Sequence, residues 1–577
     1  MSRVDRAVSV RLFGDAAVLV DLGDLHGAHA LARLLRAEFA GDRSVDDVVV
    51  GFGTVTVLVD RSRGHPGALL ELVQAHAERA TGSGAAPSPG HGEAAGAFVV
   101  PVCFDGPDLP ELADQLHMDP AGVADLLTGA DLQVAFVGFS PGFSYLVGLP
   151  SMLAEVGRRA RPRPAVPAGS VAVGGGFAGI YPGASPGGWY LVGRTDAVVF
   201  DPLRPPHALL GPGRAVRFVR AEEVAVRTPA VRRPLRAGAR PSLVVEQPGS
   251  CTLVEDGGRR GVAGVGVPGA GAADAVDLCV ANRLVGNEDL DAALEITLRG
   301  PRLRAGADVH VALVAAAGIG SMLSMTVDGR AAPVGQPVPL SAGQLVEVGS
   351  VAGPVRAVLA VSGGLRVESL FGSRSSDLLS GLGPGALEAG DELALGPCGR
   401  PRGRLAVPPA GRHPAVLRVL AGPDEARSEH GDNLEWLTAG RWRTAPDSNR
   451  IGTRLLPEEG AARAEGAAEN RDPGPGTTSR RVRVTATEVA SRGMVRGAIQ
   501  LPPGGELVVL GPDHPTVGGY CVPAVVVSAD LRLLAHLAPA TPVRFEVVDQ
   551  AEAQRAFHHL EVDLAGAVTG WFPTRAG

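Results

Sequence analysis

The chain of 577 residues is 45% hydrophobic and 20% charged, as in ordinary globular proteins, and its length predicts roughly three to five domains. It contains no lysine, which excludes a P-loop lysine, a Schiff base and a biotinyl-lysine carrier among these residues. A net charge of −7 argues against nucleic acid as a partner, and 79 glycines with 47 prolines favour short strands joined by turns.

The first part of the chain has the pattern of a small α+β domain. Residues 7–20 predict two strands around a Gly-Asp turn, and Asp24 can cap a helix whose apolar residues recur at helical spacing. Residues 46–60 alternate like a hairpin, and a second amphipathic helix follows. We therefore predict a domain at 1–80, followed by a linker at 81–96 that is rich in Gly, Ser and Pro.

A second domain is predicted at 97–225. It opens with a strand from Phe98, and Asp119–Pro120 supplies the cap and first residue of a helix. Two loops dense in Gly, Pro and aromatic residues follow, at 138–150 and 166–195. Such a composition fixes one backbone shape, whereas flexible linkers lack the aromatics and prolines. We interpret the two loops as walls of a pocket, although plain hairpin turns of a β-barrel are an equal alternative.

The second half predicts two further domains, both mainly β. A basic connector at 227–240 leads into a domain at 241–400, in which a helix at 272–285 is followed by short strands. A last domain at 412–570 is again mostly strand, apart from a polar, broken segment at 457–480. Because aromatics make up only 4% of the chain, we expect cores of Val, Leu and Ala.

The sequence matches two familiar motifs, G-x-S-x-G and G-x-G-x-x-G, but without the neighbouring residues and elements that each motif needs to function. Ser140 and Ser185 match G-x-S-x-G, yet a proline follows each serine, and the oxyanion hole of that motif needs the N–H of this residue. The G-x-G-x-x-G matches at 174–179 and 264–269 lack the strand-turn-helix setting of a dinucleotide site. We expect neither chemistry.

Acidic, amide and arginine side chains recur beside glycines in the second half. Asp274 and Asn282 are eight residues apart, so both can face one site if they share a helix. Arginine forks and glycine amides suit carboxylate or phosphate, and unpaired aspartates suit Mg²⁺. For any single group, a structural turn or salt bridge is the alternative. Together they predict a small-molecule pocket for an anionic ligand.

The cysteines and the apolar runs indicate the cellular setting. Five scattered cysteines without a C-x-x-C pair argue against a zinc site or a disulfide framework and favour a reducing, cytoplasmic environment. No apolar run reaches the roughly 18 residues of a membrane helix, so we expect no membrane association.

Long motifs carry a family resemblance. GFSPGFSYLVGLP and VPAGSVAVGGGFAGIYPGASPGGWYLVGRT closely resemble the allophanate hydrolase subunit 1 family. EQPGSCTLVEDGGRRGVAGVGVPGAGAADAVDLCVANRLVGN, SGGLRVESLFGSRSS and GAIQLPPGGELVVLGPDHPTVGGYCVPAVVVSADL resemble the subunit 2 family. Together they resemble a fusion of subunits B and C of the bacterial ATP-dependent 5-oxoprolinase. Relatives of that family include the carboxyltransferase domain of urea carboxylase and a sporulation-kinase inhibitor with its antagonist.

The resemblance implies a fold and a set of site residues. The fold would be mainly β with α+β parts: cyclophilin-like β-barrel domains, one in the N-terminal half and two in the C-terminal half, plus the small N-terminal α+β domain. Catalytic positions would be Asp256, Asp274 and Asp513, with the metal unassigned. Substrate- or nucleotide-binding positions would be Phe143, Tyr145, Ser170, Tyr181, Ser185, Trp189, Arg194, Arg259, Asn282, Arg450, Arg454, Gln500 and Tyr520.

The implied activity is the ATP-dependent opening of 5-oxoproline to L-glutamate. This activity would need ATP and Mg²⁺ as cofactors and a separate A-type subunit as a partner. The chain itself would form a homo-oligomer. One alternative is a carboxyltransferase acting on urea or a related amide with a separate biotin carrier, and another is a non-catalytic regulator of a histidine kinase. The sequence departs from many relatives at Thr128, Asn449, Thr453 and His536, where substrate specificity would differ if these residues contact substrate.

Overall fold

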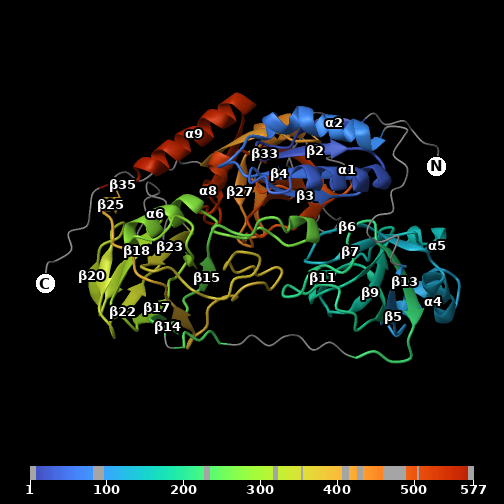
Figure 1. Cartoon of the computed structure of the whole chain (residues 1–577), viewed down its shortest axis with the longest axis horizontal. Helices are drawn as coiled ribbons and strands as arrows, with labels where there is room; N and C mark the ends of the chain where they lie inside the picture. The colour runs from blue at the N-terminus through green and yellow to red at the C-terminus, as the bar shows by residue number, and fades with distance from the viewer. Residues whose placement is uncertain are drawn as a thin grey trace, which may run out of the picture.

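The computed structural model describes residues 8–81, 96–225, 234–238, 240–315, 323–351, 355–405, 415–424, 433–458, 489–502 and 506–569. The predicted linker, the basic connector and the polar segment at 457–480 fall largely outside these residues. Within them the chain is mainly β with α+β parts (Figure 1). No described helix is both long enough and apolar enough to cross a bilayer.

The N-terminal part is a four-stranded antiparallel sheet covered by two helices. Its elements are β1 (Ser9–Leu12), β2 (Ala17–Asp21), α1 (Leu25–Glu38), β3 (Val45–Val50), β4 (Thr54–Val59), η1 (Pro66–Leu69) and α2 (Leu70–Thr81). The strand order is β1-β2-β4-β3, which confirms both predicted strand pairs. The Asp24 side chain accepts a hydrogen bond from Gly27 N at 2.7 Å and so caps α1 as expected.

Both faces of this sheet are buried, because side chains alternate along each strand. Val18 and Val20 of β2 pack under the helices. The alternate residues Ala17 and Leu19 point to the opposite face of the sheet and pack against Val522 of the last barrel. The blue N-terminal elements accordingly lie against the orange and red C-terminal ones in Figure 1. The N-terminal sheet and the last barrel therefore form one packed unit.

The second part is a seven-stranded sheet of order β12-β9-β10-β7-β6-β13-β5 with a side hairpin of β11 and β8. Cys103, which follows the edge strand β5, forms an antiparallel bridge with Arg194 of the other edge strand, β12. This bridge joins the two edges of the sheet, so the sheet curls into a barrel. Its elements are β5 (Phe98–Val102), α3 (Leu109–Gln115), α4 (Pro120–Thr128), β6 (Leu132–Val137), β7 (Ser144–Val147), α5 (Ser151–Ala154), β8 (Arg163–Val166), β9 (Ser170–Gly174), β10 (Phe177–Ile180), β11 (Ser185–Gly187), β12 (Tyr190–Arg194) and β13 (Ala215–Arg220). The predicted cap Asp119 binds Gly122 N at 2.7 Å.

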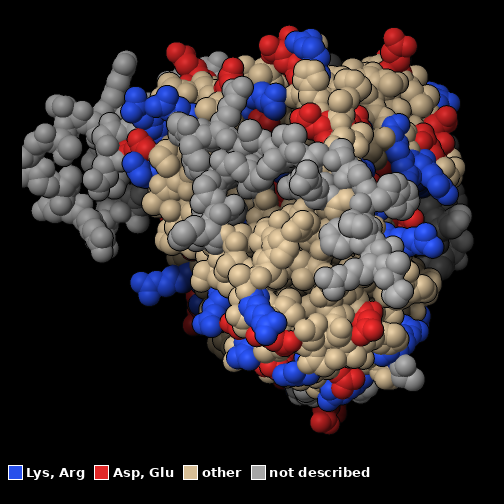
Figure 2. All heavy atoms as spheres, turned by 90° about the vertical axis from the view of Figure 1, so that its left-hand side faces the viewer, with Lys and Arg blue, Asp and Glu red and all other residues tan. Residues whose placement is uncertain are grey.

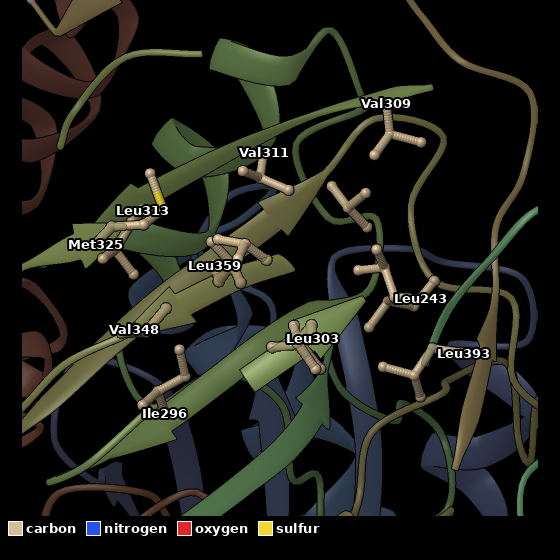
Figure 3. Packing of buried hydrophobic residues seen from close by; sticks show 14 of the residues in the cluster. Leu243, Ile296, Leu303, Val309, Val311, Leu313, Met325, Val348, Leu359 and Leu393 are labelled. Atoms are coloured by element: carbon tan, nitrogen blue, oxygen red, sulfur yellow. The ribbon is translucent and has the colours of Figure 1, made fainter. Parts of the chain in front are cut away.

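The third part packs a six-stranded sheet, β20-β19-β22-β17-β14-β24, on a five-stranded sheet, β15-β16-β23-β18-β21. Figure 3 shows Leu303 of β17, Leu359 of β23 and Val311 of β18 in one core, whose described residues include no aromatic side chain. This confirms the expected Val, Leu and Ala composition. The elements are β14 (Ser242–Gln247), β15 (Cys251–Glu255), η2 (Ala263–Val265), α6 (Ala275–Val285), β16 (Ala293–Thr297), β17 (Arg302–Ala305), β18 (Val309–Val314), β19 (Met325–Val327), β20 (Arg330–Ala332), β21 (Val338–Leu340), β22 (Leu345–Val348), β23 (Arg356–Val361), β24 (Glu392–Ala394) and β25 (Arg404–Leu405).

The last part is a closed barrel of order β26-β33-β30-β31-β28-β27-β34. Its elements are β26 (Ala415–Ala421), α7 (Asn433–Ala439), β27 (Trp442–Thr444), β28 (Gly452–Pro457), β29 (Arg492–Gly493), β30 (Ala498–Leu501), β31 (Leu507–Leu510), β32 (Val517–Gly518), β33 (Cys521–Val526), η3 (Ser528–Asp530), α8 (Leu531–Leu534), β34 (Pro542–Val547), α9 (Gln550–Gly566) and β35 (Val568–Thr569). The closed barrel agrees with the predicted β class, whereas the number of cyclophilin-like barrels in the chain stays a prediction.

The helices α6 and α9 differ from the sequence prediction, and the short helices α7 and α8 also lie in the part expected to be mostly strand. α6 begins three residues later than expected, because the Asp274 side chain accepts hydrogen bonds from Val276 N and Asp277 N and so caps the helix. α9 was missed altogether, since the last part was expected to be mostly strand. Its start was visible as a capping box, in which Asp549 and Glu552 each accept a hydrogen bond from the other's backbone N–H.

An arginine of the third part binds two aspartates of the N-terminal sheet. Arg260 donates a hydrogen bond to Asp60 and lies 3.4 Å from Asp46. Burial raises the pKa of Asp46 to about 6, although Arg260 opposes the shift. On the face shown in Figure 2, arginines and carboxylates are likewise interspersed.

The contribution of Asp46 to stability should therefore fall as the pH rises through the acid range. The folded pKa of Asp46 lies above the unfolded value near 4, so the folded chain holds this proton more tightly, and ionisation between about pH 4 and pH 6 favours unfolding. Because Asn cannot ionise, the free energy of unfolding of Asp46→Asn should rise relative to that of the wild type as the pH goes from about 4 to about 6. We expect a relative gain of about 1 kcal/mol after allowance for solvent screening. Urea unfolding at both pH values measures this, and a difference independent of pH would contradict it.

Candidate functional site

A cavity of about 560 Å³ lies where three parts of the chain meet. Phe52 comes from the N-terminal sheet, and Tyr145 and Phe177 come from the second part. Gln500 and Tyr520 come from the last barrel. Its size is within the roughly 300–1,000 Å³ of small-molecule sites. The walls thus come from segments far apart in sequence.

Aromatic rings form one wall of the cavity. The ring of Phe177 packs edge-on to those of Phe52 and Tyr145, with centroids 5.7 and 5.4 Å away. Behind this wall lies a second layer formed by Phe143, Tyr181 and Trp189, in which the Phe143 ring is 5.0 Å from Tyr181 and 5.4 Å from Trp189. In a chain with 4% aromatic residues, this density marks the cavity as a site built for a flat or apolar ligand surface.

Glycine permits this stacking at one decisive place. An added Cβ at Gly179, on β10, would approach both Trp189 and Phe143 to about 3 Å. The backbone of β10 can therefore lie directly on the two rings. This is the physical reason that the glycine-rich stretch 166–195 forms a wall, as predicted.

Uncharged polar groups supply hydrogen bonds in the cavity. Gln500 is 8% exposed, and its Nε2 donates a hydrogen bond of 3.4 Å to the Met494 sulfur, a weak acceptor, so its second N–H and its amide oxygen can bind a ligand. Burial raises the pKa of the Tyr145 phenol and, in the layer behind, raises that of Tyr181 to about 12. Both phenols are therefore protonated donors near neutral pH.

The cavity contains one cation and no anion. Arg158 lines it, and none of the described lining residues is Asp, Glu, His or Cys. Mg²⁺ prefers carboxylate oxygens, so the residues present do not fit a Mg²⁺ site in this cavity. The side chains can hold and orient a small, partly planar molecule by stacking, neutral hydrogen bonds and one positive charge.

The predicted residues divide between the cavity and other places. Tyr145, Gln500 and Tyr520 line it, and Phe143, Tyr181 and Trp189 form the layer behind. The other ten lie outside the lining: Ser170, Ser185, Arg194, Asp256, Arg259, Asp274, Asn282, Arg450, Arg454 and Asp513. Sequence reasoning missed Phe52, Phe139, Arg158, Phe177 and Ser491 as lining residues. For Phe177 the signal was its place in the glycine-rich stretch.

Arg450 and Asp513 belong to an internal network instead. Arg450 makes a two-pronged ion pair with Asp513, at 2.9 and 2.8 Å, and donates to Glu295 at 2.7 Å. Glu255 lies 3.4 Å from the same guanidinium. Burial would lower the pKa of Arg450, but these carboxylates hold it well above its usual range. The network joins the last barrel to the third part.

Asp256 and Arg259 stabilise a turn next to that network. Asp256 accepts hydrogen bonds from the hydroxyls of Ser373 and Ser375 and from Arg374 N at 2.6 Å. Arg259 donates to the backbone oxygen of Ser375. The salt-bridge or turn alternative considered above therefore describes their contacts, and their proposed chemical roles stay predictions.

Asp274 and Asn282 do not face one site. Asp274, which precedes α6, pairs with His536 at 2.8 Å and Arg532 at 3.1 Å. Asn282 instead donates to the backbone oxygens of Asp289 and Asp291. The expectation from their spacing was wrong because Asp274 serves as the cap, not as a residue on a helix face.

Asp274, Asp277 and His536 form the only cluster with metal-ligand geometry in the part of the chain that the structure describes, their ligand atoms lying within 4.8 Å of one another. Arg532 is in contact with both carboxylates, and it supplies the charge that a metal would bring. Burial would raise the pKa of Asp274, but Arg532 and His536 outweigh it and hold that pKa below its usual range. The set does not fit Mg²⁺, which takes oxygen ligands.

The remaining predicted residues lie on strands away from the cavity. Arg194 donates to Asp105 and to the backbone oxygen of Val224, both at 2.9 Å. Arg454 makes two exposed ion pairs, with Asp447 and Glu506. Ser170 and Ser185 belong to β9 and β11.

Comparison with known proteins places the chain in a family. A model of the carboxyltransferase domain, subdomain C and D, matches residues 8–210, and a model of subdomain A and B matches residues 265–547. The chain is also 31% identical over 318 residues to the C-type subunit of 5-oxoprolinase from Escherichia coli (strain K12), covering 54% of this chain and 94% of that protein. The chain belongs to the carboxyltransferase-domain family.

This carboxyltransferase-domain protein is also similar to a separate B-type subunit and to a solved single-chain structure. It is 46% identical over 127 residues, 22% of its length, to the B-type subunit of 5-oxoprolinase from Escherichia coli O157:H7, and it spans 58% of that relative. The crystal structure of TTHA0988 superimposes with a TM-score of 0.77 at 32% identity, covering 93% of this chain and 100% of that one. The two halves are therefore homologous to 5-oxoprolinase subunits B and C, in that order.

Proposed function

We propose that the chain is the B/C component of an ATP-dependent 5-oxoprolinase and that its cavity binds 5-oxoproline. The observation that carries the proposal is the composition of the cavity: Tyr145 and Phe177 come from the half similar to the B-type subunit, and Gln500 and Tyr520 from the half similar to the C-type subunit. Thr128, Asn449, Thr453 and His536, where the sequence departs from relatives, lie outside the lining. These four differences therefore do not alter the residues that would contact such a ligand.

The cavity suits a lactam ring. A five-membered ring can stack on the wall of Phe177 and Tyr145, and the Gln500 amide can both donate to the lactam oxygen and accept from its N–H. A protonated Tyr145 is a second donor for that oxygen. These groups would fix the plane and direction of the amide within the cavity.

The lactam bond needs activation because amide resonance stabilises it. Transfer of the γ-phosphoryl group from ATP to the lactam oxygen, with release of ADP, would make the ring carbon an electrophile. Addition of water to that carbon and cleavage of the C–N bond, with the nitrogen taking a proton, would open the ring to a γ-glutamyl phosphate, from which a second water would release phosphate and L-glutamate. We assign the nucleotide and Mg²⁺ to no residue of this chain, since the described cavity lacks a carboxylate. We propose that a separate A-type subunit completes the reaction, while this chain binds and orients the lactam.

The test is reconstitution. The purified chain, its A-type partner, ATP and 5-oxoproline should give ADP and glutamate in equal amounts, and leaving out either protein should stop both. ADP at background in the complete mixture would remove the proposal.

A second candidate is carboxyl transfer to urea or a related amide, which the carboxyltransferase-domain matches favour. The chain has no lysine to carry biotin, so a separate carrier protein would be needed. Urea-dependent loss of the carboxyl group from a carboxylated biotin carrier, with no ADP formed from 5-oxoproline, would favour this candidate over the first.

A further inference from the structure

Arg158 is the one charged side chain among the described residues that line the cavity. It is exposed, whereas Tyr145 and Gln500 beside the same space are largely buried, so it lies at the mouth. A ligand that stacks on the aromatic wall would extend toward this guanidinium. The position of Arg158 thus raises the question of what it binds.

Two neighbouring arginines, Arg159 and Arg163, are already paired, and Arg161 does not line the cavity, which leaves Arg158 distinct. Arg159 and Arg163 bind Asp108 at 2.9 and 2.5 Å, and Arg159 also binds Glu111. The Asp108 carboxylate in turn accepts from Leu191 N at 2.8 Å, which fixes the loop to β12. In the described part of the chain, Arg158 has no ion pair of its own. Two of the four arginines at 158–163 therefore hold this segment, and of the other two Arg158 is the one among the described lining residues.

The backbone beneath Arg158 leaves room for it. Gly175 has a φ of +61°, and an added Cβ there would lie 3.3 Å from Arg158 Nε. The guanidinium thus lies directly over the turn between β9 and β10, next to the aromatic wall. Its charge also acts to lower the pKa values of Tyr145 and Tyr181, against the larger effect of burial. The guanidinium of Arg158 is therefore near enough to the phenols of Tyr145 and Tyr181 to interact with them electrostatically.

We propose that Arg158 binds a carboxylate of the ligand, so that the cavity selects small amides that carry a carboxylate over neutral amides. The inference rests on the proposed function in taking 5-oxoproline as the ligand. A guanidinium fork matches a carboxylate geometrically, and a partly desolvated pair is stronger than one in water. The neutral hydrogen-bonding groups at Gln500 and Tyr145 then remain for the lactam.

The test compares two ligands that differ only in the carboxylate. Calorimetric titration of the full chain with 5-oxoproline and with 2-pyrrolidinone is done for the wild type, Arg158→Gln, Arg158→Lys and the control Arg161→Gln, since Arg161 is exposed on the same loop and does not line the cavity. We expect Arg158→Gln to raise the Kd for 5-oxoproline about 10- to 100-fold and to leave that for 2-pyrrolidinone unchanged. Arg158→Lys should lie between, and Arg161→Gln should match the wild type.

Each result separates this inference from the proposed function. Unchanged binding of 5-oxoproline by Arg158→Gln, or an equal loss for both ligands, would overturn the carboxylate role. In the reconstituted assay, the same variant should raise KM more than it lowers kcat. If Arg158→Gln forms glutamate with an unaltered KM, the role of Arg158 is wrong and the proposed function stands. If binding depends on Arg158 but no glutamate forms, the role of Arg158 stands and the proposed function is wrong.

Discussion

Replacing Arg450 with methionine is expected to destabilise the protein by about 3–5 kcal/mol, because it removes the cation from a buried network. Asp513 and Glu295 would lose hydrogen-bonded partners at 2.7–2.9 Å, and Glu255 would lose its ion pair. Burial already raises the pKa of Glu255, and without Arg450 the other carboxylates would also have to take up protons or draw in water.

The matched control is Arg454→Met. Arg454 is also an arginine that the sequence marked as a binding residue, but its side chain is 42% exposed and its partners are surface carboxylates. Its loss should cost at most about 1 kcal/mol. Urea unfolding is followed by tryptophan fluorescence, to which Trp436 and Trp442 of the last barrel contribute. Equal effects of the two substitutions would contradict the buried network.

Replacing Gln500 with leucine is expected to lower kcat/KM for 5-oxoproline about 10- to 100-fold while stability changes little. Leucine keeps most of the volume but cannot pair with the lactam, so the ligand would lose its hydrogen bonds on entering the cavity. Among the described residues the amide donates to the thioether sulfur of Met494, a weak acceptor, which is why folding should tolerate the change.

Gln74→Leu serves as the control for this prediction, since Gln74 is a half-buried residue of α2 that does not line the cavity and donates to Glu78 at 2.8 Å. ADP and glutamate formation are measured for both variants over a range of 5-oxoproline concentrations. If Gln500→Leu retains wild-type kcat/KM, the amide does not contact the substrate.

Much of the cavity wall could be predicted from sequence because its composition is unusual. Stretches in which Gly, Pro and aromatic residues alternate can adopt few backbone shapes, so the loops around Tyr145 and Phe177 were identifiable as a wall. Phe52 could not be found in this way. Its role depends on the docking of the N-terminal sheet on the last barrel, where Phe52 N donates to the Ser491 oxygen at 2.6 Å, a contact between residues 439 positions apart.

The acidic and arginine residues show the limit of reading spacing alone. A fork such as Arg450 suits a ligand carboxylate and a protein carboxylate equally well, and only the fold decides which one is opposite it. Here Asp513 and Glu295 occupy it. Arg158 shows the converse, since its sequence neighbours Arg159 and Arg163 look alike but are bound to Asp108. The catalytic roles of Asp256, Asp274 and Asp513 stay predictions, and in the structure all three are buried and hydrogen-bonded.

The central claim is that the space between the two halves is the substrate site, and a crystal structure of the chain with 5-oxoproline tests it most directly. We predict the lactam ring against Phe177 and Tyr145, its amide at Gln500 and its carboxylate at Arg158. Ligand density at another place, or an empty cavity at saturating 5-oxoproline, would contradict the claim.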